Sequence, residues 1–306
     1  MGKALRIGII TAYPEEDWHS QQMIEASSQR GDVVIIRPER LAARITRDGV
    51  KVLSDQVELE TVDGFVLARG FGEQGNPDFQ VPVYQILARS GKVLINNIDA
   101  LLCAIDKFET SYRFQRAGLP TPAVAVVQDA EVAYGVLREW GRAVAKPLFG
   151  SLGIGIELIE DTTEGRALLP VLLKRFRAIY LQEYVPTPGR DIRAFVVGNQ
   201  VAASIYRMAA PGQWQTNISR GGRPMACQLD AETSRLSVAA AAAVGLDYTG
   251  VDILEGLTGP QVIEVNGNPQ WLGVLDATGK NMAEAIVAWV VDRIIQPTAK
   301  GGEHVA

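Results

Sequence analysis

The first hundred residues alternate between short apolar runs and helical patterns. Four runs rich in Ile, Val and Leu are predicted to form buried strands, at residues 5–10, 33–36, 64–68 and 92–95. Helical segments are expected at about 17–30 and 78–90, and Asp48-Gly49 indicates a hairpin. Strand, helix and strand in alternation predict a small parallel α/β domain.

Beyond residue 96 the predicted strands turn back on themselves and alternate with helices. Helices are predicted at residues 106–118, 130–141, 231–244 and 281–295. Strands are predicted at residues 123–127, 143–147, 155–160, 180–185, 191–208, 248–254 and 260–266. Gly198-Asn199 indicates a hairpin turn inside one of these runs. Antiparallel strands combined with helices predict an α+β organisation.

Length and charge narrow the class of protein. The 306 residues are 47% hydrophobic, enough for two or three compact units at roughly 100–200 residues each. A net charge of −5 gives no general attraction to nucleic acid or to anionic membranes. No stretch approaches the ~20 uncharged apolar residues of a membrane span, and the N-terminus lacks a signal-peptide pattern. We therefore expect a soluble, cytoplasmic protein.

Any bound metal must be held by oxygen atoms. The two histidines, His19 and His304, are too few for a His-rich site, and Cys103 and Cys227 belong to no spaced motif. The cysteines are interpreted as reduced thiols. The expected metal is magnesium or manganese rather than zinc.

A glycine-rich stretch, "AKPLFGSLGIGIEL", contains Lys146, Gly150, Ser151, Gly153 and Gly155. Closely spaced glycines let backbone N–H groups approach a ligand, and the ligand of such loops is usually a phosphate. The stretch is not a Walker loop, because its lysine precedes the glycines and strands flank it. The alternative is a flexible hairpin tip between two strands, and this pattern alone leaves both open.

The stretch "LQEYV" is predicted to form a strand with Gln182 and Tyr184 on one face and Glu183 on the other. Such a strand could offer backbone groups to an adenine edge and a carboxylate to an amine or a ribose. The alternative is an exposed glutamate on an ordinary strand.

The stretch "VIEVN" places polar residues in an apolar strand. Glu264 and Asn266 are two apart, so they project from the same face. Asp252 lies in the apolar run "GVDIL", and the turn at residues 256–260 suits a hairpin that joins both runs. The three oxygen-bearing side chains would then converge as magnesium ligands. The alternative is that arginines neutralise the carboxylates, the candidates being Arg193, Arg207 and Arg220.

The stretch "QWQTNISRGG", residues 213–222, holds an asparagine, an arginine and two glycines. Taken alone, it is interpreted as a surface loop.

The order of these motifs along residues 107–266 resembles the ATP-grasp superfamily and, within it, the RimK-type α-L-glutamate ligases. The resemblance extends from about residue 5 to 295. It implies an ATP-grasp fold, in which an N-terminal parallel α/β domain precedes two α+β subdomains that clamp the nucleotide. The implied boundaries are residues 1–95, 96–180 and 181–298, followed by a tail at 299–306.

The resemblance also implies roles for individual residues. Those implied to bind ATP are Lys107, Lys146, Ser151, Gly153, Gly155, Gln182, Glu183, Tyr184, Val185, Asp191, Gln215, Thr216 and Asn217. Those implied to hold magnesium or manganese are Asp252, Glu264 and Asn266. Arg207, Arg220 and Asn217 are implied to act in catalysis beside the transferring oxygens.

The implied activity is ATP- and magnesium-dependent amide formation through an acyl-phosphate. We expect L-glutamate, or a similar amino acid, to be added to a carboxylate-bearing small metabolite of pterin or furan type. The stretches "PEEDWHSQQ" and "NPQWLG" favour this metabolite-directed branch. The alternatives are glutamylation of a protein C-terminus and a non-catalytic ATP-binding protein of the same fold. A homo-oligomer, dimer or tetramer, is expected.

Two positions depart from the family pattern. Where relatives often have Ser-Pro-Gly after the metal-binding asparagine, this chain reads Asn268-Pro269-Gln270-Trp271. Gln215 occupies a position where close relatives have arginine. The first departure borders the expected site of the attacking amine, and the second removes a positive charge near the phosphates.

Overall fold

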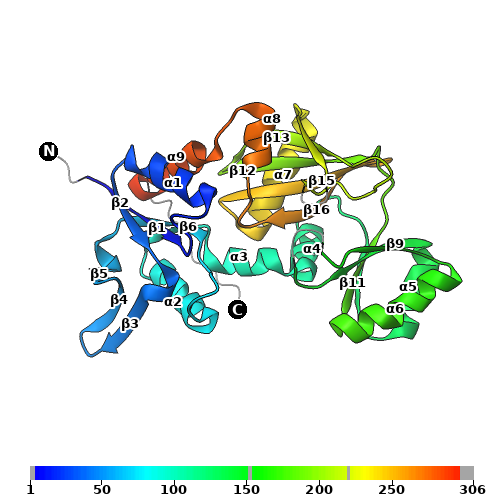
Figure 1. The fold of residues 1–306 in the computed structure, drawn as a ribbon, viewed down its shortest axis with the longest axis horizontal. Coiled ribbons are helices and arrows are strands. Elements are labelled where there is room, and N and C mark those ends of the chain that lie inside the picture. Colours follow the sequence, from blue (N-terminus) through cyan, green and yellow to red (C-terminus); the bar gives the residue numbers. More distant parts are fainter. Residues whose placement is uncertain (1–3, 151–153, 219–220, 297–306) are drawn as a thin grey trace. The chain divides into compact units, whose positions relative to one another are not determined.

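The computed structural model describes residues 4–150, 154–218 and 221–296. Within these ranges the chain forms two compact units (Figure 1). The N-terminal unit joins the residues up to Asp99 with the segment from Asn281 onward, and the second unit spans Ala100–Lys280. No helix in the described part of the chain is long and apolar enough to cross a membrane.

A parallel sheet forms the centre of the N-terminal unit, with the strand order β2-β1-β6-β7. Its strands are β1 (Arg6–Thr11), β2 (Asp32–Ile36), β6 (Gly64–Arg69) and β7 (Val93–Ile95). The interior strands β1 and β6 are buried along almost their whole length, as continuous apolar runs predict for a sheet covered on both faces. The predicted parallel α/β arrangement is confirmed.

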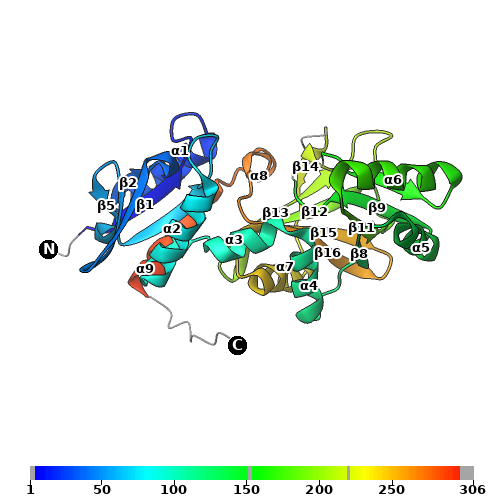
Figure 2. The same cartoon turned by 90° about the horizontal axis from the view of Figure 1, so that it is seen from below.

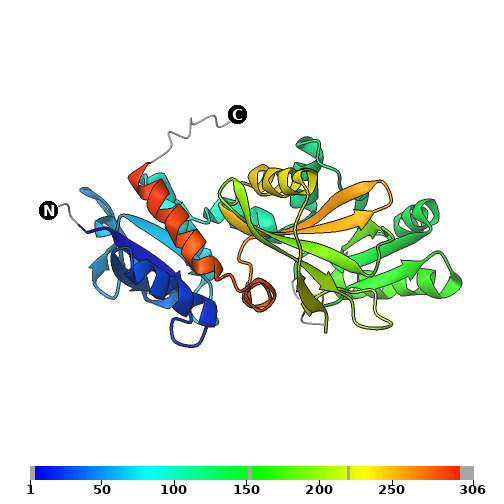
Figure 3. The same ribbon diagram turned by 90° about the horizontal axis from the view of Figure 1, so that it is seen from above.

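Helices cover both faces of this sheet. The helices are α1 (Trp18–Ser28), α2 (Pro77–Arg89) and α9 (Met282–Ile295). Figure 2 shows α2 over one face, and Figure 3 shows α1 and α9 side by side over the other. Asp17 caps α1 by accepting a hydrogen bond from the Ser20 backbone N–H at 2.8 Å.

The placement of α9 differs from the expected third subdomain, which extended to residue 298. The apolar face of α9, including Met282, Ile286 and Val290, is buried in the N-terminal unit. Asn281, its N-cap, donates a hydrogen bond to the Gln22 side chain at 2.6 Å. An amphipathic pattern shows that a helix buries one face, but it does not show which sheet receives that face.

A small antiparallel sheet extends the N-terminal unit. It consists of β3 (Leu41–Thr46), β4 (Gly49–Ser54) and β5 (Val57–Glu58), flanked by the 3₁₀ turns η1 (Pro38–Arg40) and η2 (Leu59–Thr61). Thr46 pairs with Gly49 at the tip of the β3–β4 hairpin. The predicted hairpin at Asp48-Gly49 is therefore confirmed.

The second unit begins with helices that lead into an antiparallel sheet of order β10-β9-β11-β8. The strands are β8 (Val124–Val127), β9 (Arg142–Pro147), β10 (Glu157–Glu160) and β11 (Ile179–Glu183). The helices are α3 (Ile98–Ile105), α4 (Lys107–Arg116), α5 (Ala130–Trp140) and α6 (Thr163–Phe176). The helices α5 and α6 pack on this sheet, and Leu137 and Leu169 fill the core beneath them.

A second antiparallel sheet completes this unit, with the order β14-β13-β12-β15-β16. The strands are β12 (Arg190–Val197), β13 (Gln200–Met208), β14 (Arg223–Ala226), β15 (Tyr248–Gly256) and β16 (Gly259–Asn266). The remaining helices are α7 (Ala231–Val244) and α8 (Leu272–Thr278). The predicted turn at Gly198-Asn199 joins β12 to β13. The predicted mixed architecture, with one parallel and further antiparallel sheets, is confirmed.

Candidate active site

A cavity in the second unit is lined by both antiparallel sheets. Twelve of the residues implied to act in binding or catalysis lie on its wall: Lys146, Gln182, Glu183, Tyr184, Val185, Asp191, Arg207, Gln215, Thr216, Asn217, Asp252 and Glu264. They come from strands β9, β11, β12, β13, β15 and β16 and from the loop before β14. Lys146 and Glu264, 118 positions apart in the chain, thus meet around one space.

Lys146 is a buried cation on the wall of this cavity. It lies on β9 opposite Tyr180 of β11, and its Nζ donates a hydrogen bond to Gln182 Oε1 at 2.7 Å. Burial lowers the pKa of the Lys146 ammonium, while the negative charges of Glu264 and Asp252 act in the opposite direction. The Nε2 atom of Gln182 is buried and has no hydrogen-bond partner among the described residues, so it can donate to a ligand.

A chain of buried ion pairs forms the floor. Arg207 of β13 donates through Nε to Asp191 Oδ1 at 2.7 Å and through Nη2 to Asp252 Oδ2 at 2.9 Å. Arg193 of β12 holds the same Asp252 carboxylate with two N–H groups, one of them 2.8 Å from Oδ2. Thr216 donates to Asp191 Oδ2 at 2.6 Å. Asp191, Arg207 and Asp252 are all at most 4% exposed.

These ion pairs shift the pKa values of Asp252 and Arg207 and keep both side chains charged. Burial on its own raises the pKa of Asp252, but the charges of Arg193 and Arg207 reverse this and lower it below the usual range. Burial lowers the pKa of Arg207, and the two carboxylates more than offset that effect and raise it. Asp252 is thus neutralised by arginines, as one of the sequence-based alternatives proposed. Arg220, another arginine of that alternative, lies outside the described residues.

The predicted β15–β16 hairpin brings the two carboxylates together. Asp252 lies directly opposite Glu264 in the register, and Gly250 lies opposite Asn266. The Glu264 carboxylate makes no hydrogen bond or salt bridge with a described residue. Asn266 donates through Nδ2 to the Gly250 carbonyl at 3.3 Å, and its Oδ1 has no partner among the described residues.

This donor set fits a hard divalent cation. No three His, Cys, Asp or Glu side chains cluster as a metal site within the described ranges, so the amide oxygen of Asn266 is needed beside the two carboxylates. Asp252 accepts three hydrogen bonds and retains further lone-pair capacity. Carboxylate and amide oxygens are the ligands that magnesium prefers.

Lys107, Gly150 and Gly155 are not among the described residues that line the cavity. Asp106 caps α4 directly before Lys107, whose Nζ donates to the Gly150 carbonyl at 2.9 Å. This bond ties the lysine to the start of the glycine stretch. Gly155 has a positive φ of 74°, a conformation that favours glycine. Ser151 and Gly153 lie outside the described residues.

Sequence reasoning missed the apolar part of the cavity. Val144 and Leu254 line the wall, each two positions from a predicted charged residue on the same strand. The period of two along β9 and β15 could have identified both. Trp214 also lines the cavity, and its position beside Gln215 was the available signal. Arg193 was one of the three candidate partners for the carboxylates, and the β12–β15 register places it directly opposite Asp252.

Comparisons with known proteins identify the family of this chain. The family model for the RimK-like ATP-grasp domain matches residues 104–290. Tetrahydromethanopterin:alpha-L-glutamate ligase of Methanosarcina acetivorans is 33% identical over 319 residues, which cover 93% of this chain and 98% of that protein. Probable alpha-L-glutamate ligase 1 of Shewanella amazonensis is 29% identical, covering 94% of this chain and 95% of that protein.

Solved structures show the same fold. The ATP-grasp ligase PsnB complexed with minimal precursor superimposes with a TM-score of 0.76 at 19% identity, covering 95% of this chain and all of that chain. The RimK domain protein ATP-grasp from Sphaerobacter thermophilus gives a TM-score of 0.67 at 19% identity, covering 94% of this chain and 99% of that chain. At these identities the likeness shows the ATP-grasp fold. Together with the family match, it shows that this chain belongs to the RimK-like ATP-grasp family.

Proposed function

We propose that this protein is an ATP-dependent ligase that joins the amino group of L-glutamate to a carboxylate of a pterin-type small molecule. The observation that carries the proposal is the cavity of the second unit, where Lys146, Gln182 and Glu264 meet over a floor of buried ion pairs. Near-full-length similarity to a protein named tetrahydromethanopterin:alpha-L-glutamate ligase supports the substrate class.

The adenine end of ATP is assigned to the end of β11. Gln182 has a buried, unsatisfied amide N–H there, and the backbone of residues 183–185 continues along the cavity wall. Arg142 lies 4.4 Å from the Tyr184 ring centroid, which fixes that ring at the wall. Hydrogen-bonding groups beside an apolar wall are what a flat, nitrogen-rich base requires.

The phosphates are assigned to the lysines. Lys146 supplies a desolvated ammonium whose electrostatic effect is stronger than in water, and Lys107 supplies a second positive charge beside the glycine stretch. Asp252, Glu264 and Asn266 would hold magnesium or manganese. That ion supplies screening of the phosphate charge when it is bound.

The reaction needs positioning and charge neutralisation more than a protein nucleophile. The acceptor carboxylate attacks the γ-phosphorus, ADP leaves, and an acyl-phosphate forms. The glutamate amine then attacks the acyl carbon, phosphate leaves, and the amide nitrogen loses a proton. Arg207, held between Asp191 and Asp252, keeps a fixed positive charge next to the transferring oxygens without reorganising.

The test uses the purified full chain with ATP, magnesium, L-glutamate and a carboxylate-bearing reduced pterin. We expect acceptor-dependent ADP release and a product heavier by one glutamyl residue by mass spectrometry. ADP release with acidic-tailed proteins only would favour C-terminal glutamylation instead. Absence of ADP release with both classes would favour a non-catalytic ATP-binding protein.

A variant tests the metal assignment. Glu264→Gln removes the one carboxylate of the set that has no partner in the described protein, so we expect ADP release to fall by about 10²-fold or more. Glu164→Gln, an exposed glutamate in the first turn of α6, is the matched control and should leave the rate unchanged. Unchanged turnover in Glu264→Gln would remove Glu264 from the site.

A further inference from the structure

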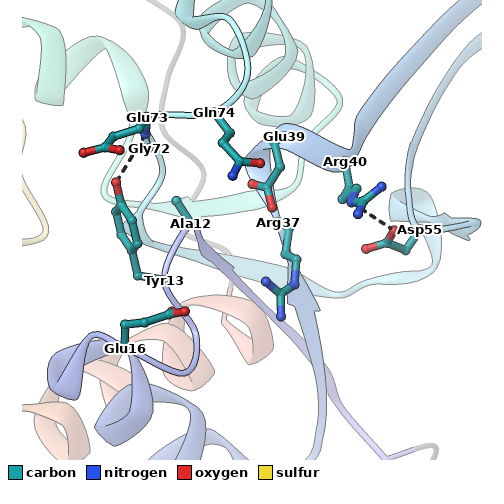
Figure 4. A pocket seen from close by; sticks show the side chains of 10 residues that line it. All are labelled: Ala12, Tyr13, Glu16, Arg37, Glu39, Arg40, Asp55, Gly72, Glu73 and Gln74. Atoms are coloured by element: carbon teal, nitrogen blue, oxygen red, sulfur yellow. Dashed lines mark hydrogen bonds and ion pairs between the residues drawn. The ribbon is translucent and has the colours of Figure 1, made fainter.

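A second cavity, of about 480 Å³, lies within the N-terminal unit (Figure 4). Small-molecule sites commonly have about 300–1,000 Å³. The cavity lies beyond the carboxyl ends of the parallel strands, and the loops after β1, β2 and β6 line it with Tyr13, Glu16, Arg37, Glu39, Glu73 and Gln74. The stretch "PEEDWHSQQ" begins at this edge.

The topology makes this edge a general binding position. The chain passes from β1 through α1 to β2 on one side, and from β6 through α2 to β7 on the other. The carboxyl ends of β1 and β6 therefore mark the point where the strand order reverses, and open parallel sheets bind ligands in that crevice. A Cβ on Gly72 would lie 2.5 Å from Ala12 Cβ, so glycine is required for the two loops to meet there.

The two arginines of this cavity have carboxylate neighbours within the same chain. Arg37 forms an ion pair with Glu15 at 2.6 Å, and Arg40 lies 4.0 Å from Asp55. The cavity is lined by four carboxylates, Glu16, Glu39, Asp55 and Glu73, against these two arginines, so its wall is net negative.

The glutamates have no such partners. The side chains of Glu16, Glu39 and Glu73 make no hydrogen bond or ion pair with any residue that the structure describes. A space lined by unpaired carboxylates disfavours the anionic end of an acceptor and favours groups that donate N–H bonds.

One part of the wall combines a carboxylate with amides. Figure 4 shows Glu39 and Gln74 extending toward the same part of the cavity, with Tyr13 on the other side. Behind them, Gln80 is 1% exposed, and neither its amide nitrogen nor its amide oxygen has a partner among the described residues. A Cβ built on Gly75 would lie 2.5 Å from Gln80 Nε2 and 3.3 Å from the Glu39 Cα, so this buried amide lies beside Gly75, the residue that follows Gln74.

We propose that this cavity binds the aminopyrimidinone ring of the acceptor, an inference that rests on the proposed pterin-type substrate. One edge of that ring presents an exocyclic amine beside a ring N–H, and a carboxylate accepts both in parallel. Glu39 accepts this pair. Gln74 provides an amide donor and acceptor for the neighbouring ring atoms. Tyr13 offers its ring face to the flat heterocycle, while its hydroxyl accepts a hydrogen bond from the Glu73 backbone N–H at 3.2 Å.

Calorimetry with the full chain tests the proposal without turnover. The probe is 6-methyltetrahydropterin, which has the ring but no carboxylate. We expect the unmodified protein to bind it and Glu39→Gln to bind it about tenfold or more weakly, because two hydrogen bonds to a charged acceptor are lost. Gln74→Ala, at an exposed position, should weaken binding by about two- to fivefold.

The control is Glu284→Gln, an exposed glutamate on α9 in the same unit, whose affinity should equal that of the unmodified protein. Equal affinities of Glu39→Gln and the unmodified protein, or absence of binding by the unmodified protein, would overturn the assignment. Far-ultraviolet circular dichroism establishes that Glu39→Gln is folded, and Gln74→Ala provides an independent variant if it is not.

ADP release with the complete acceptor separates this inference from the proposed reaction. If the ring binds through Glu39 but no ADP is released with glutamate and the acceptor, the reaction is wrong and the ring site stands. If ADP is released with the same KM for the acceptor in Glu39→Gln and in the unmodified protein, the ring site is wrong and the reaction stands. We expect a raised acceptor KM with an unchanged KM for ATP.

Discussion

The two cavities of this protein hold their charges in opposite ways. In the second unit, Arg207 lies between the carboxylates of Asp191 and Asp252, and all three side chains are buried. In the N-terminal unit, Glu16, Glu39 and Glu73 are partly or fully exposed and have no partner in the described protein. Buried pairs cannot reorganise cheaply, so they suit a site that must stabilise developing charge. Unpaired groups near solvent can adapt to a ligand, so they suit recognition.

Removing Arg207 is the strongest way to break this contrast. Arg207→Met leaves two buried carboxylates without their shared partner, so the free energy of unfolding should fall by about 3–5 kcal/mol. Urea denaturation of the full chain measures this. Arg207→Lys keeps the positive charge but loses the fork of N–H groups. Its free energy of unfolding should lie between those of Arg207→Met and the unmodified protein. A loss below about 1 kcal/mol for Arg207→Met would show that the floor is not held by these pairs.

Lys146→Met separates function from stability within the same cavity. Replacing the buried ammonium relieves its desolvation but breaks its hydrogen bond to Gln182, and these opposing effects should leave the free energy of unfolding unchanged within about 1 kcal/mol. ADP release should fall by about 10²–10³-fold. Lys174→Met, at an exposed position on α6, should change neither quantity. Retained ADP release in Lys146→Met would contradict the assignment of this lysine to the phosphates.

Asp17 tests whether the N-terminal unit also depends on a paired carboxylate. Burial on its own raises the pKa of Asp17, but interactions with His19, Arg69 and Ser20 reverse this and lower it well below the usual range. The folded state therefore keeps the charge while the unfolded chain takes up a proton. Stability from this group is present above about pH 4 and is lost as the pH falls through the lowered value.

The comparison is between the unmodified protein and Asp17→Asn. The variant should be less stable at pH 7 by about 1–2 kcal/mol, and the difference should shrink on going from pH 5 to pH 3. Chemical denaturation at each pH gives both values. A difference that stays constant over this range would show that Asp17 has an ordinary pKa in the folded protein.

The smallest effect is expected at the wall of the N-terminal cavity. The Arg37 and Glu15 side chains are 36% and 63% exposed, so Arg37→Gln should lower the free energy of unfolding by less than about 1 kcal/mol. Removing this positive charge should also leave the affinity for 6-methyltetrahydropterin unchanged or raise it. A larger loss of stability in Arg37→Gln would show that the N-terminal cavity also depends on its ion pairs, as the cavity of the second unit does.

Local patterns were sufficient for much of the fold and part of the candidate site. Alternation along "GVDIL" and "VIEVN", with a short turn between them, predicted the hairpin in which Asp252 faces Glu264. Glycine-bearing dipeptides predicted the turns of the β3–β4 and β12–β13 hairpins. These features depend on residues close together in the chain, so their signals are local.

Features that depend on distant residues could not be predicted in this way. The sequence offered Arg193, Arg207 and Arg220 alike as partners of the carboxylates. Arg193 pairs with Asp252 because β12 and β15 are neighbours in the sheet, although 59 positions separate the two residues. The N-terminal cavity exists because three strands end at the same edge, and no single stretch shows this. The roles of Lys107 and Lys146 came from the order of motifs along the chain, and they remain predictions.

The return of α9 to the N-terminal sheet has a consequence for synthesis on the ribosome. The sheet strands β1, β2, β6 and β7 emerge first, but the helix that covers part of their face is encoded after the whole of Ala100–Lys280. At about 5–20 residues per second, the intervening unit takes about 10–40 s to make. During that time the second unit can fold alone, while the apolar side chains that α9 will cover on the parallel sheet remain exposed to solvent. On the ribosome, the second unit therefore completes its fold before the N-terminal unit does.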